Sequence, residues 1–459
     1  MKPVIAILLV LSSGSAHAAS LMAGPMVSHT TTSEATIWVE TDKPAKMTVT
    51  YWSQSGEGAT LVRDVAKGKT ATTHPHTGTV KLTGLRADTG VHYEVAVDGE
   101  LIRPLSPQTF RTMPALQRRA NDPDDLTAFS VAFGSCLNPT TQPQQPIFRE
   151  MLQHRPSAFL FIGDINYMPG SESHYGTDPE LVRYAMAGYH RDVRHVPEVG
   201  AVMASTPSYG IWDDHDFGPG NSDRTFTFRD ETLAIYKRYW PNSGAGSGAT
   251  AGIFHKFQIA DVEFIMLDDR YHRDPNKAED RRTMFGDGQM VWLKESLKAS
   301  TATFKVIANG NSMVVDFHRR NELWDNFGTE RDDFIAWLFE EDINGVFFLA
   351  GDWHVGTLNK KYDEGYDYPL FELLSSNAAV RTDPIEDRTR TGWRENAQSA
   401  SKRVRDYNFG LLRFAGRKGE RTVSLRIVDE HGNVRIEQVL SETDLQEERS
   451  EDELPSTGF

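Results

Sequence analysis

Four short apolar runs in this chain each end in side chains that can bind metal ions or transfer protons. The polar clusters that follow them are Gly-Ser-Cys at 134–136, Gly-Asp-Ile-Asn-Tyr at 163–167, Asp-Asp-His-Asp at 213–216 and Gly-Asp-Trp-His at 351–354. Together they supply a thiolate, carboxylates, a phenolate and imidazoles. In open α/β sheets, ligands collect beyond the carboxyl ends of the strands, so we expect the four clusters to converge on one site.

The donor types in these clusters indicate a metal centre. Carboxylates suit hard cations such as Ca2+, Mg2+ and Mn2+. Thiolate, imidazole and phenolate suit a transition ion, and a set that includes Tyr167 favours ferric iron over zinc. Each cluster alone has a simpler explanation, because a strand-end aspartate often caps a helix and a lone histidine is often a surface residue. Four such clusters in one domain favour the metal-binding interpretation.

Cys136 is the only cysteine in the 459 residues, so it has no partner for an intramolecular disulfide. A single cysteine is commonly a small buried apolar residue. Because Cys136 shares its strand-end position with the carboxylate, phenol and imidazole clusters, we interpret it as a metal ligand.

The elements that must position these clusters follow an α/β pattern from about residue 126 to 440. Buried strands are expected at 127–133, 159–162, 208–212, 262–267, 304–308, 346–350 and 371–374. Helices are expected near 144–154, 178–190, 230–238, 287–299 and 329–341. The last β-rich piece, 409–439, has a hairpin signal around 429–433.

The N-terminal region has a different pattern of predicted secondary structure. Between residues 22 and 113, short alternating strands at 35–40, 47–52, 78–82 and 91–97 are separated by turns, which predicts a β-sandwich. Segment 82–93 resembles the strand approach of fibronectin type III-like modules. We therefore expect a signal peptide at 1–18, a β-sandwich domain at 19–116, a polar linker at 117–125, the α/β domain at 126–440 and an acidic tail at 441–459.

Composition narrows the partners and the location. Lys2, the apolar run 5–11 and Ala-His-Ala at 16–18 form a signal-peptide pattern without a twin-arginine pair, so we expect a secreted or periplasmic protein exported by the general route. The apolar run is too short for a transmembrane segment. The net charge of −15 argues against nucleic acid and anionic membranes as partners. An anionic substrate would need bound cations.

The order of the four motifs, Gly-Ser-Cys, Gly-Asp-x-x-Tyr, Trp-Asp-Asp-His-Asp and Gly-Asp-x-His, resembles the alkaline phosphatase D (PhoD-like) family. That family is a branch of the metallophosphoesterases related to purple acid phosphatases. The flanking segments 264–270, 289–293 and 304–307 are also similar to it. The resemblance covers roughly 127–380 and implies a metallophosphoesterase-type β-sandwich flanked by helices. The region before it resembles the family's N-terminal fibronectin III/Ig-like all-β domain.

Carried over by motif, the resemblance implies a ferric iron (Fe3+) site and one or two calcium (Ca2+) ions that share Asp164 with it. By the same resemblance, the further iron ligands are Cys136, Tyr167 and His354, and the calcium ligands are Asp214 and Asp352. His215 is the expected proton donor, and Asp213 or Asp216 is expected to orient it. A further metal ligand is expected from Asn309 or the nearby Asn311. Arg270 either contacts phosphate or supports the Asp-Asp turn at 268–269.

The resemblance implies hydrolysis of a small-molecule phosphate ester by a metal-bound hydroxide or oxide, with His215 as general acid. The alternative within the same site is phosphodiesterase or phospholipase-like activity. An alternative of another class is a secreted binding protein with a decayed metal site, but none of the main ligands is missing. A glycosidase built on Asp213 and Asp214 is disfavoured, because adjacent residues do not provide opposed carboxylates. The oligomeric state stays open.

Overall fold

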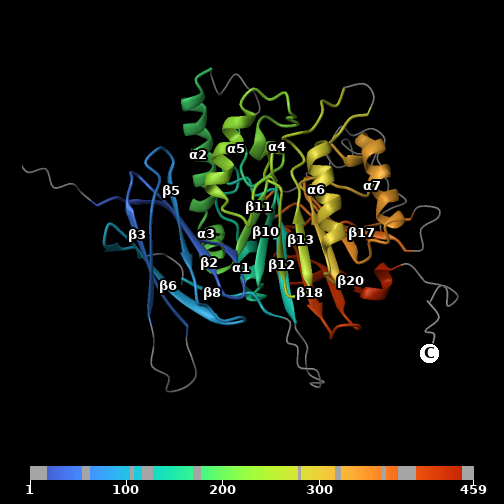
Figure 1. The fold of residues 1–459 in the computed structure, drawn as a ribbon, viewed down its shortest axis with the longest axis horizontal. Helices are drawn as coiled ribbons and strands as arrows, with labels where there is room; N and C mark the ends of the chain where they lie inside the picture. The colour runs from blue at the N-terminus through green and yellow to red at the C-terminus, as the bar shows by residue number, and fades with distance from the viewer. Residues whose placement is uncertain are drawn as a thin grey trace, which may run out of the picture.

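The computed structural model describes residues 18–53, 63–103, 108–115, 128–168, 177–277, 281–315, 322–362, 368–380 and 400–446. The expected linker, and all of the expected signal peptide except its last residue, lie outside these ranges. An all-β region and a larger α/β region lie side by side (Figure 1). Within the described residues, no helix has both the length and the apolar character needed to cross a membrane.

The N-terminal region is a sandwich of two antiparallel sheets, as predicted. One sheet has the order β1 (Leu21–Thr30), β2 (Ala35–Thr41), β5 (His76–Leu82). The other has the order β4 (Asp64–Lys69), β3 (Lys46–Ser53), β6 (Gly90–Val97), β7 (Glu100–Leu101), with β8 (Thr109–Arg111) also paired to β6. Buried and partly exposed residues alternate along β6, so Val91, Tyr93 and Val95 enter the core between the sheets.

The α/β region contains two six-stranded sheets. The first has the order β11 (Ser208–Ile211), β10 (Ala158–Ile162), β9 (Phe129–Gly134), β18 (Asn408–Ala415), β19 (Thr422–Asp429), β20 (Val434–Ser441). The second has the order β12 (His255–Ile259), β13 (Val262–Met266), β14 (Phe304–Ala308), β15 (Val346–Ala350), β17 (Leu370–Ser375), β16 (Gly356–Lys361). Strands β9–β11 are parallel, as are β13, β14, β15 and β17.

The two sheets pack face to face through aromatic side chains. The ring of Phe414 on β18 lies 4.9 Å from Phe129 on β9, between ring centroids. It also lies 5.8 Å from Phe304 and 6.2 Å from Phe264, which belong to the second sheet. Buried side chains of both sheets therefore form one continuous core, which is the arrangement expected of the metallophosphoesterase-type sandwich.

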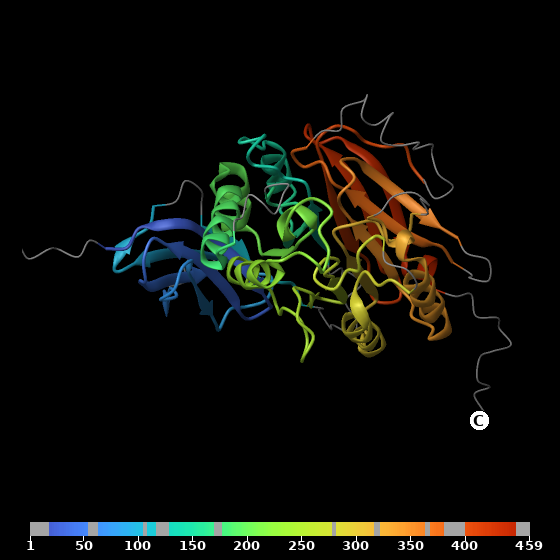
Figure 2. The ribbon, with the colours of Figure 1, turned by 90° about the horizontal axis from the view of Figure 1, so that it is seen from above.

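Helices flank this sandwich. Helices α2 (Pro179–His195), α3 (Pro197–Ser205) and α5 (Arg229–Tyr239), drawn in green, lie next to the blue N-terminal sandwich (Figure 1). Helices α6 (Gly286–Ala299) and α7 (Gly328–Glu340), in yellow and orange, lie together farther along the molecule (Figure 2). The remaining short helices are α1 (Ile147–Gln153), α4 (Asp214–Phe217), η2 (Trp324–Phe327) and η3 (Glu442–Leu445).

Hydrogen bonds and an ion pair join the N-terminal sandwich to the helices. The hydroxyl of Tyr93 donates to the carbonyl of Ala204 at 2.7 Å. The guanidinium of Arg191 on α2 contacts the carboxylate of Glu40 on β2, 2.6 Å away. At the other end of the chain, Leu445 of η3 is buried, so part of the segment assigned above to the acidic tail packs on the domain; residues 447–459 lie outside the described ranges.

The topology brings the polar clusters to one edge. Parallel strands β9, β10 and β11 end side by side in the first sheet, and β14 and β15 end side by side in the second. Every expected buried strand of the α/β region is present, with ends within a few residues of the prediction. The strands β12 and β16 and the helix α3 are additional.

Candidate metal centre

Three of the four polar clusters, those at 134–136, 163–167 and 351–354, leave their strands through unusual backbone conformations. Cys136, Asp164, Asp352 and His354 have positive φ angles of 60°, 51°, 70° and 53°. Few residues other than glycine adopt this region, and such strained conformations cluster at functional sites. Four such residues at neighbouring strand ends are therefore consistent with a functional site.

Two glycines allow the turns to pack closely. Gly163 has a φ of 96°, and a Cβ there would lie 2.6 Å from the Cβ of Asp213. A Cβ on Gly351 would lie 2.6 Å from the Oγ of Ser135 and 2.8 Å from the carbonyl oxygen of Gly310. Gly163 is therefore required by its backbone angle, whereas Gly351 is required by close approach to neighbouring strand ends.

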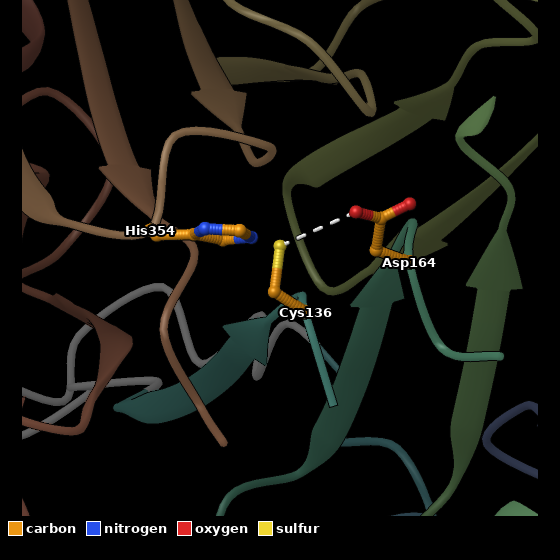
Figure 3. A group of neighbouring side chains, drawn as sticks. All are labelled: Cys136, Asp164 and His354. Carbon is orange, nitrogen blue, oxygen red and sulfur yellow. Dashed lines mark hydrogen bonds between the residues drawn. The ribbon is translucent and has the colours of Figure 1, made fainter. Parts of the chain in front are cut away.

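Cys136, Asp164 and His354 point toward one another at the strand ends (Figure 3). One donor atom from each lies within 4.8 Å of the other two. The Sγ of Cys136 is 3.6 Å from Oδ2 of Asp164, and the Tyr167 hydroxyl donates to the same oxygen at 3.3 Å. The structure thus brings together all four residues expected to hold iron.

Two further groups of donors share Asp164. One contains Asp214 and His215, and the other contains Asp213 and Asp352; in each group the donor atoms lie within 4.8 Å of one another. Because Asp164 belongs to all three groups, its carboxylate lies where neighbouring ions could share it. Asp213, expected only as a residue that orients the histidine, therefore also lies where it could bind a cation.

Burial makes this cluster of acidic groups unfavourable without cations. Burial, together with the negative charge of neighbouring aspartates, raises the pKa of Asp164 well above its usual value. Burial raises the pKa of Asp352 and of the Cys136 thiol in the same direction, with nearby carboxylates adding to it. A buried charge is costly unless it is paired or bound to a metal, so the cluster is suited to cations.

Asp214 differs from its neighbours. Burial opposes its ionisation, but the charges of Arg270 and His215 outweigh that effect, and the pKa of Asp214 is about 2. Its carboxylate accepts hydrogen bonds from the backbone N–H groups of His215 at 2.7 Å and Asn221 at 2.6 Å. Asp214 is thus an anchored carboxylate next to Asp164.

The loop after β14 supplies the two candidate asparagines, both fully buried. The side-chain amide of Asn309 donates to the carbonyl of Asn311 at 2.9 Å, which leaves the Oδ1 of Asn309 without a hydrogen-bond partner among the described residues. Between them, the carbonyl of Gly310 accepts from the backbone N–H of Gly351 at 3.0 Å, so the loop packs against the turn that carries Asp352. The Oδ1 of Asn311 is also without a hydrogen-bond partner among the described residues, so each of the two buried amide oxygens fits a calcium ligand.

Arg270 is fully buried, and its Nε donates to Oδ1 of Asp213 at 2.6 Å. It also forms ion pairs of 3.7 Å with Asp269 and with Glu322. The guanidinium therefore supports the turn at 268–269, one of the two expected roles, and in addition neutralises Asp213. Glu322 belongs to no sequence motif. Burial is the main cause of the raised pKa of Asp352, and the negative charge of Glu322 is the next largest cause.

His215 lies against Tyr167, with ring centroids 4.4 Å apart. Its Nδ1 has no hydrogen-bond partner within the described ranges. Asp216, one of the two residues expected to orient this ring, instead accepts from the backbone N–H groups of Asn166 at 2.7 Å and Asp213 at 3.1 Å. The position of His215 is set by its backbone and by the tyrosine ring.

Comparison with known proteins agrees with this geometry. The family model for PhoD-like phosphatases matches residues 131–425, and that for a domain of unknown function (DUF7800) matches 18–115. The curated relative alkaline phosphatase D of Bacillus subtilis (strain 168) is 23% identical over 323 residues, which is 61% of this chain and 53% of the relative. The chain thus matches about half the length of that relative.

Two solved structures share the fold. A structure of PhoD superposes with a TM-score of 0.68 at 16% identity, covering 93% of this chain and 91% of the other. The purple acid phosphatase PPD1 from yellow lupin (Lupinus luteus) gives a TM-score of 0.60 at 12% identity, covering 91% and 74%. The family match extends over more than half of the sequence and includes all of the clustered donors, and the chain therefore belongs to the PhoD-like phosphatase family.

Proposed function

We propose that this protein is a metal-dependent phosphoesterase that hydrolyses small-molecule phosphate esters. The observation that supports the proposal most is that three groups of metal-binding side chains overlap at Asp164. Adjacent cation sites with a shared carboxylate are the arrangement used to hold both sides of a phosphoryl group. Family membership supports the same class of reaction.

We assign Fe3+ to Cys136, Asp164, Tyr167 and His354, because a thiolate, a phenolate and an imidazole are ligands for a transition ion. We assign Ca2+ to the oxygen donors on the other side of Asp164, namely Asp214, Asp352 and Asn309, with Asp213 as an additional candidate. When bound, these ions would neutralise charge on the phosphoryl oxygens and lower the pKa of water. The close grouping of Cys136 and His354 with Asp164 supports the iron assignment. The grouping of Asp164 with Asp214, and separately with Asp213 and Asp352, supports the calcium assignment.

His215 is the proton donor in this proposal. Its backbone N–H contacts Asp164 at 3.3 Å, so the ring is fixed next to the ligand that all three groups share. The side chain is only partly buried, which leaves it accessible to a leaving group. An imidazole in this position can protonate the departing alkoxide, a contribution that is typically ~10²–10⁴-fold in rate.

Hydrolysis of two monoesters by His215→Ala tests this role. We expect kcat/KM for an alkyl phosphate, whose leaving group needs a proton, to fall by about 10²-fold or more. For p-nitrophenyl phosphate, whose leaving group departs without one, the loss should be much smaller. The matched control is His431→Ala, which replaces an exposed histidine in the β19–β20 turn and should change neither rate. Equal losses for both esters in His215→Ala would exclude the proton-donor role.

The same assay with bis-p-nitrophenyl phosphate measures the preference for monoesters or diesters. We also propose that the protein is exported to the periplasm or secreted, on the basis of the N-terminal sequence pattern. Cell fractionation followed by N-terminal sequencing tests this, with cleavage after Ala18 as the expected result. Full-length protein found only in the cytoplasm would contradict it.

A further inference from the structure

A cavity of about 310 Å³ lies between the N-terminal sandwich and the helices α2 and α3. These helices lie beside the sandwich in both views (Figures 1 and 2). None of the candidate metal ligands lines this cavity. Its volume falls at the lower end of the range for small-molecule sites, ~300–1,000 Å³, and such sites often occur at domain interfaces.

The walls of the cavity are mainly apolar but carry positive charge. The apolar contribution comes from β1, the segment after β7 and α3, with Leu21, Pro25, Met26, Ile102, Pro197 and Ala201 among the lining residues. Among the described residues, the lining side chains that can carry charge are Arg103, Arg194 and His195, and none is an aspartate or glutamate. This is notable in a chain that has 64 acidic and only 49 basic residues.

Arg194 is the central feature of the cavity, because its side chain is buried without an acidic partner among the described contacts. It is 6% exposed. Its two terminal nitrogens donate to the carbonyls of His190 and Tyr239, each at 2.7 Å, whereas its Nε has no hydrogen-bond partner within the described ranges. The nearby carboxylate of Glu40 forms its ion pair with Arg191 instead.

Aromatic rings take the place of a counter-ion at Arg194. The guanidinium carbon lies 4.9 Å from the ring centroids of both Trp38 and Trp240, and 5.1 Å from that of Tyr239. Cation–π contacts and carbonyl dipoles offset only part of the cost of burying a charge. Burial lowers the pKa of Arg194 only to about 10, so the group stays charged at neutral pH. A cationic group of this kind beside an apolar cavity is complementary to an anion with an apolar body.

We propose that this cavity binds a small amphipathic anion, with its acidic head near Arg194 and Arg103 and its aliphatic body against β1 and α3. The inference is independent of the phosphoesterase proposal, because the two sites share no residue. The head-group chemistry is common to carboxylates and sulfonates, and the structure favours a single-chain ligand because the volume is small.

Titration calorimetry of the full chain with octanoate tests the proposal, and the fluorescence of Trp38 and Trp240 beside Arg194 provides a second readout. We expect saturable binding of octanoate and at least tenfold weaker binding of 1-octanol, which has the same chain but no charge. Filling the cavity with Ala201→Phe should weaken octanoate binding at least tenfold, and Arg103→Ala should weaken it at least threefold.

Two matched variants serve as controls. Ala201→Ser keeps the volume of the cavity and should bind octanoate like the unmodified chain. Arg63→Ala removes an exposed arginine of the same domain that lies over Trp52 and does not line the cavity, and it should also bind normally. If Ala201→Phe does not fold, as judged by circular dichroism, the exposed Arg103 still provides a variant that reports on the cavity.

Absence of octanoate binding at millimolar concentration would overturn the proposal, as would binding that Ala201→Phe and Arg103→Ala both leave unchanged. Equal affinity for octanoate and 1-octanol would overturn the requirement for an anionic head. Phosphatase activity measured without octanoate reports on the metal centre separately, so failure here would leave the proposed function standing.

Discussion

Removing the positive charge of Arg270 is expected to destabilise the protein strongly. Arg270→Met retains an unbranched, mostly apolar side chain of similar length but deletes the guanidinium. Three carboxylates then lose a cation: Asp213, 2.6 Å from the Nε, and Asp269 and Glu322, each 3.7 Å from a guanidinium nitrogen. Breaking one partner out of a buried ion pair typically costs about 3–5 kcal/mol, and we expect a loss of that size at pH 8.

The loss should depend on pH in a defined direction. Burial already raises the pKa of Asp213 and Asp269 and places that of Glu322 at about 7, even with Arg270 present. Without the arginine these folded-state pKa values rise further above those of the unfolded chain. At pH 5 the carboxyls with raised pKa are mainly protonated in the folded state of both proteins, so the variant loses less. As the pH rises they ionise in the folded unmodified protein but less readily in the folded variant, and the loss grows.

Urea unfolding at pH 5 and pH 8, at equal metal content, measures both effects. The matched control is Arg224→Met, because Arg224 forms a 2.7 Å ion pair with Asp274 but its side chain is 51% exposed. An exposed pair contributes about 0–1 kcal/mol, so this variant should be nearly neutral. If Arg270→Met costs no more than Arg224→Met, or if its cost is the same at both pH values, the reasoning about the buried charge cluster is refuted.

Two further predictions concern the stability of the two sheets that position the site. Burial lowers the pKa of His255 to about 4 from 6.5, so its contribution to stability is complete above pH 6.5 and is lost as the pH falls toward 4. This loss of unfolding free energy between pH 6.5 and pH 4 is at most ~3 kcal/mol, and His255→Gln should remove it. Unfolding of the unmodified protein and of His255→Gln at pH 7 and pH 4.5 measures this pH dependence. Phe414→Ala should cost about 3–5 kcal/mol in denaturant unfolding, because its ring joins the two sheets. A loss below about 1 kcal/mol would contradict that packing.

The parallel strands could be predicted from the sequence because they are buried on both faces. Strands β10, β14 and β15 consist entirely of buried residues, and β10 and β15 read as continuous apolar runs. Strand β16 and helix α3 were not predicted. Strand β16 contains Thr357, Asn359 and two lysines, so its buried residues are not recognisable by polarity. Helix α3 follows α2 after a single residue, Val196, so Pro197 in the first turn of α3 is the main local sign of a boundary between them.

The donor residues of the candidate site could also be predicted, because each follows a recognisable strand. The residues that neutralise and support them could not. Arg270 and Asp213 are 57 positions apart, and only the tertiary fold shows that they pair. Glu322 belongs to no motif, and its place beside Arg270 depends on how β14 and α7 are connected. Local patterns therefore identify candidate ligands, whereas the buried counter-charges depend on the complete fold.

The identity of the metals is the most direct test of the central assignment. Elemental analysis and the visible spectrum of the purified protein should show about one iron per chain, together with calcium and a tyrosinate–iron charge-transfer band. Tyr167→Phe should abolish the band, whereas Tyr362→Phe, which alters a tyrosine that is 64% exposed, should retain it. Cys136→Ala should remain folded but lose iron and most activity. A colourless, iron-free protein that is fully active as a phosphatase would contradict the account.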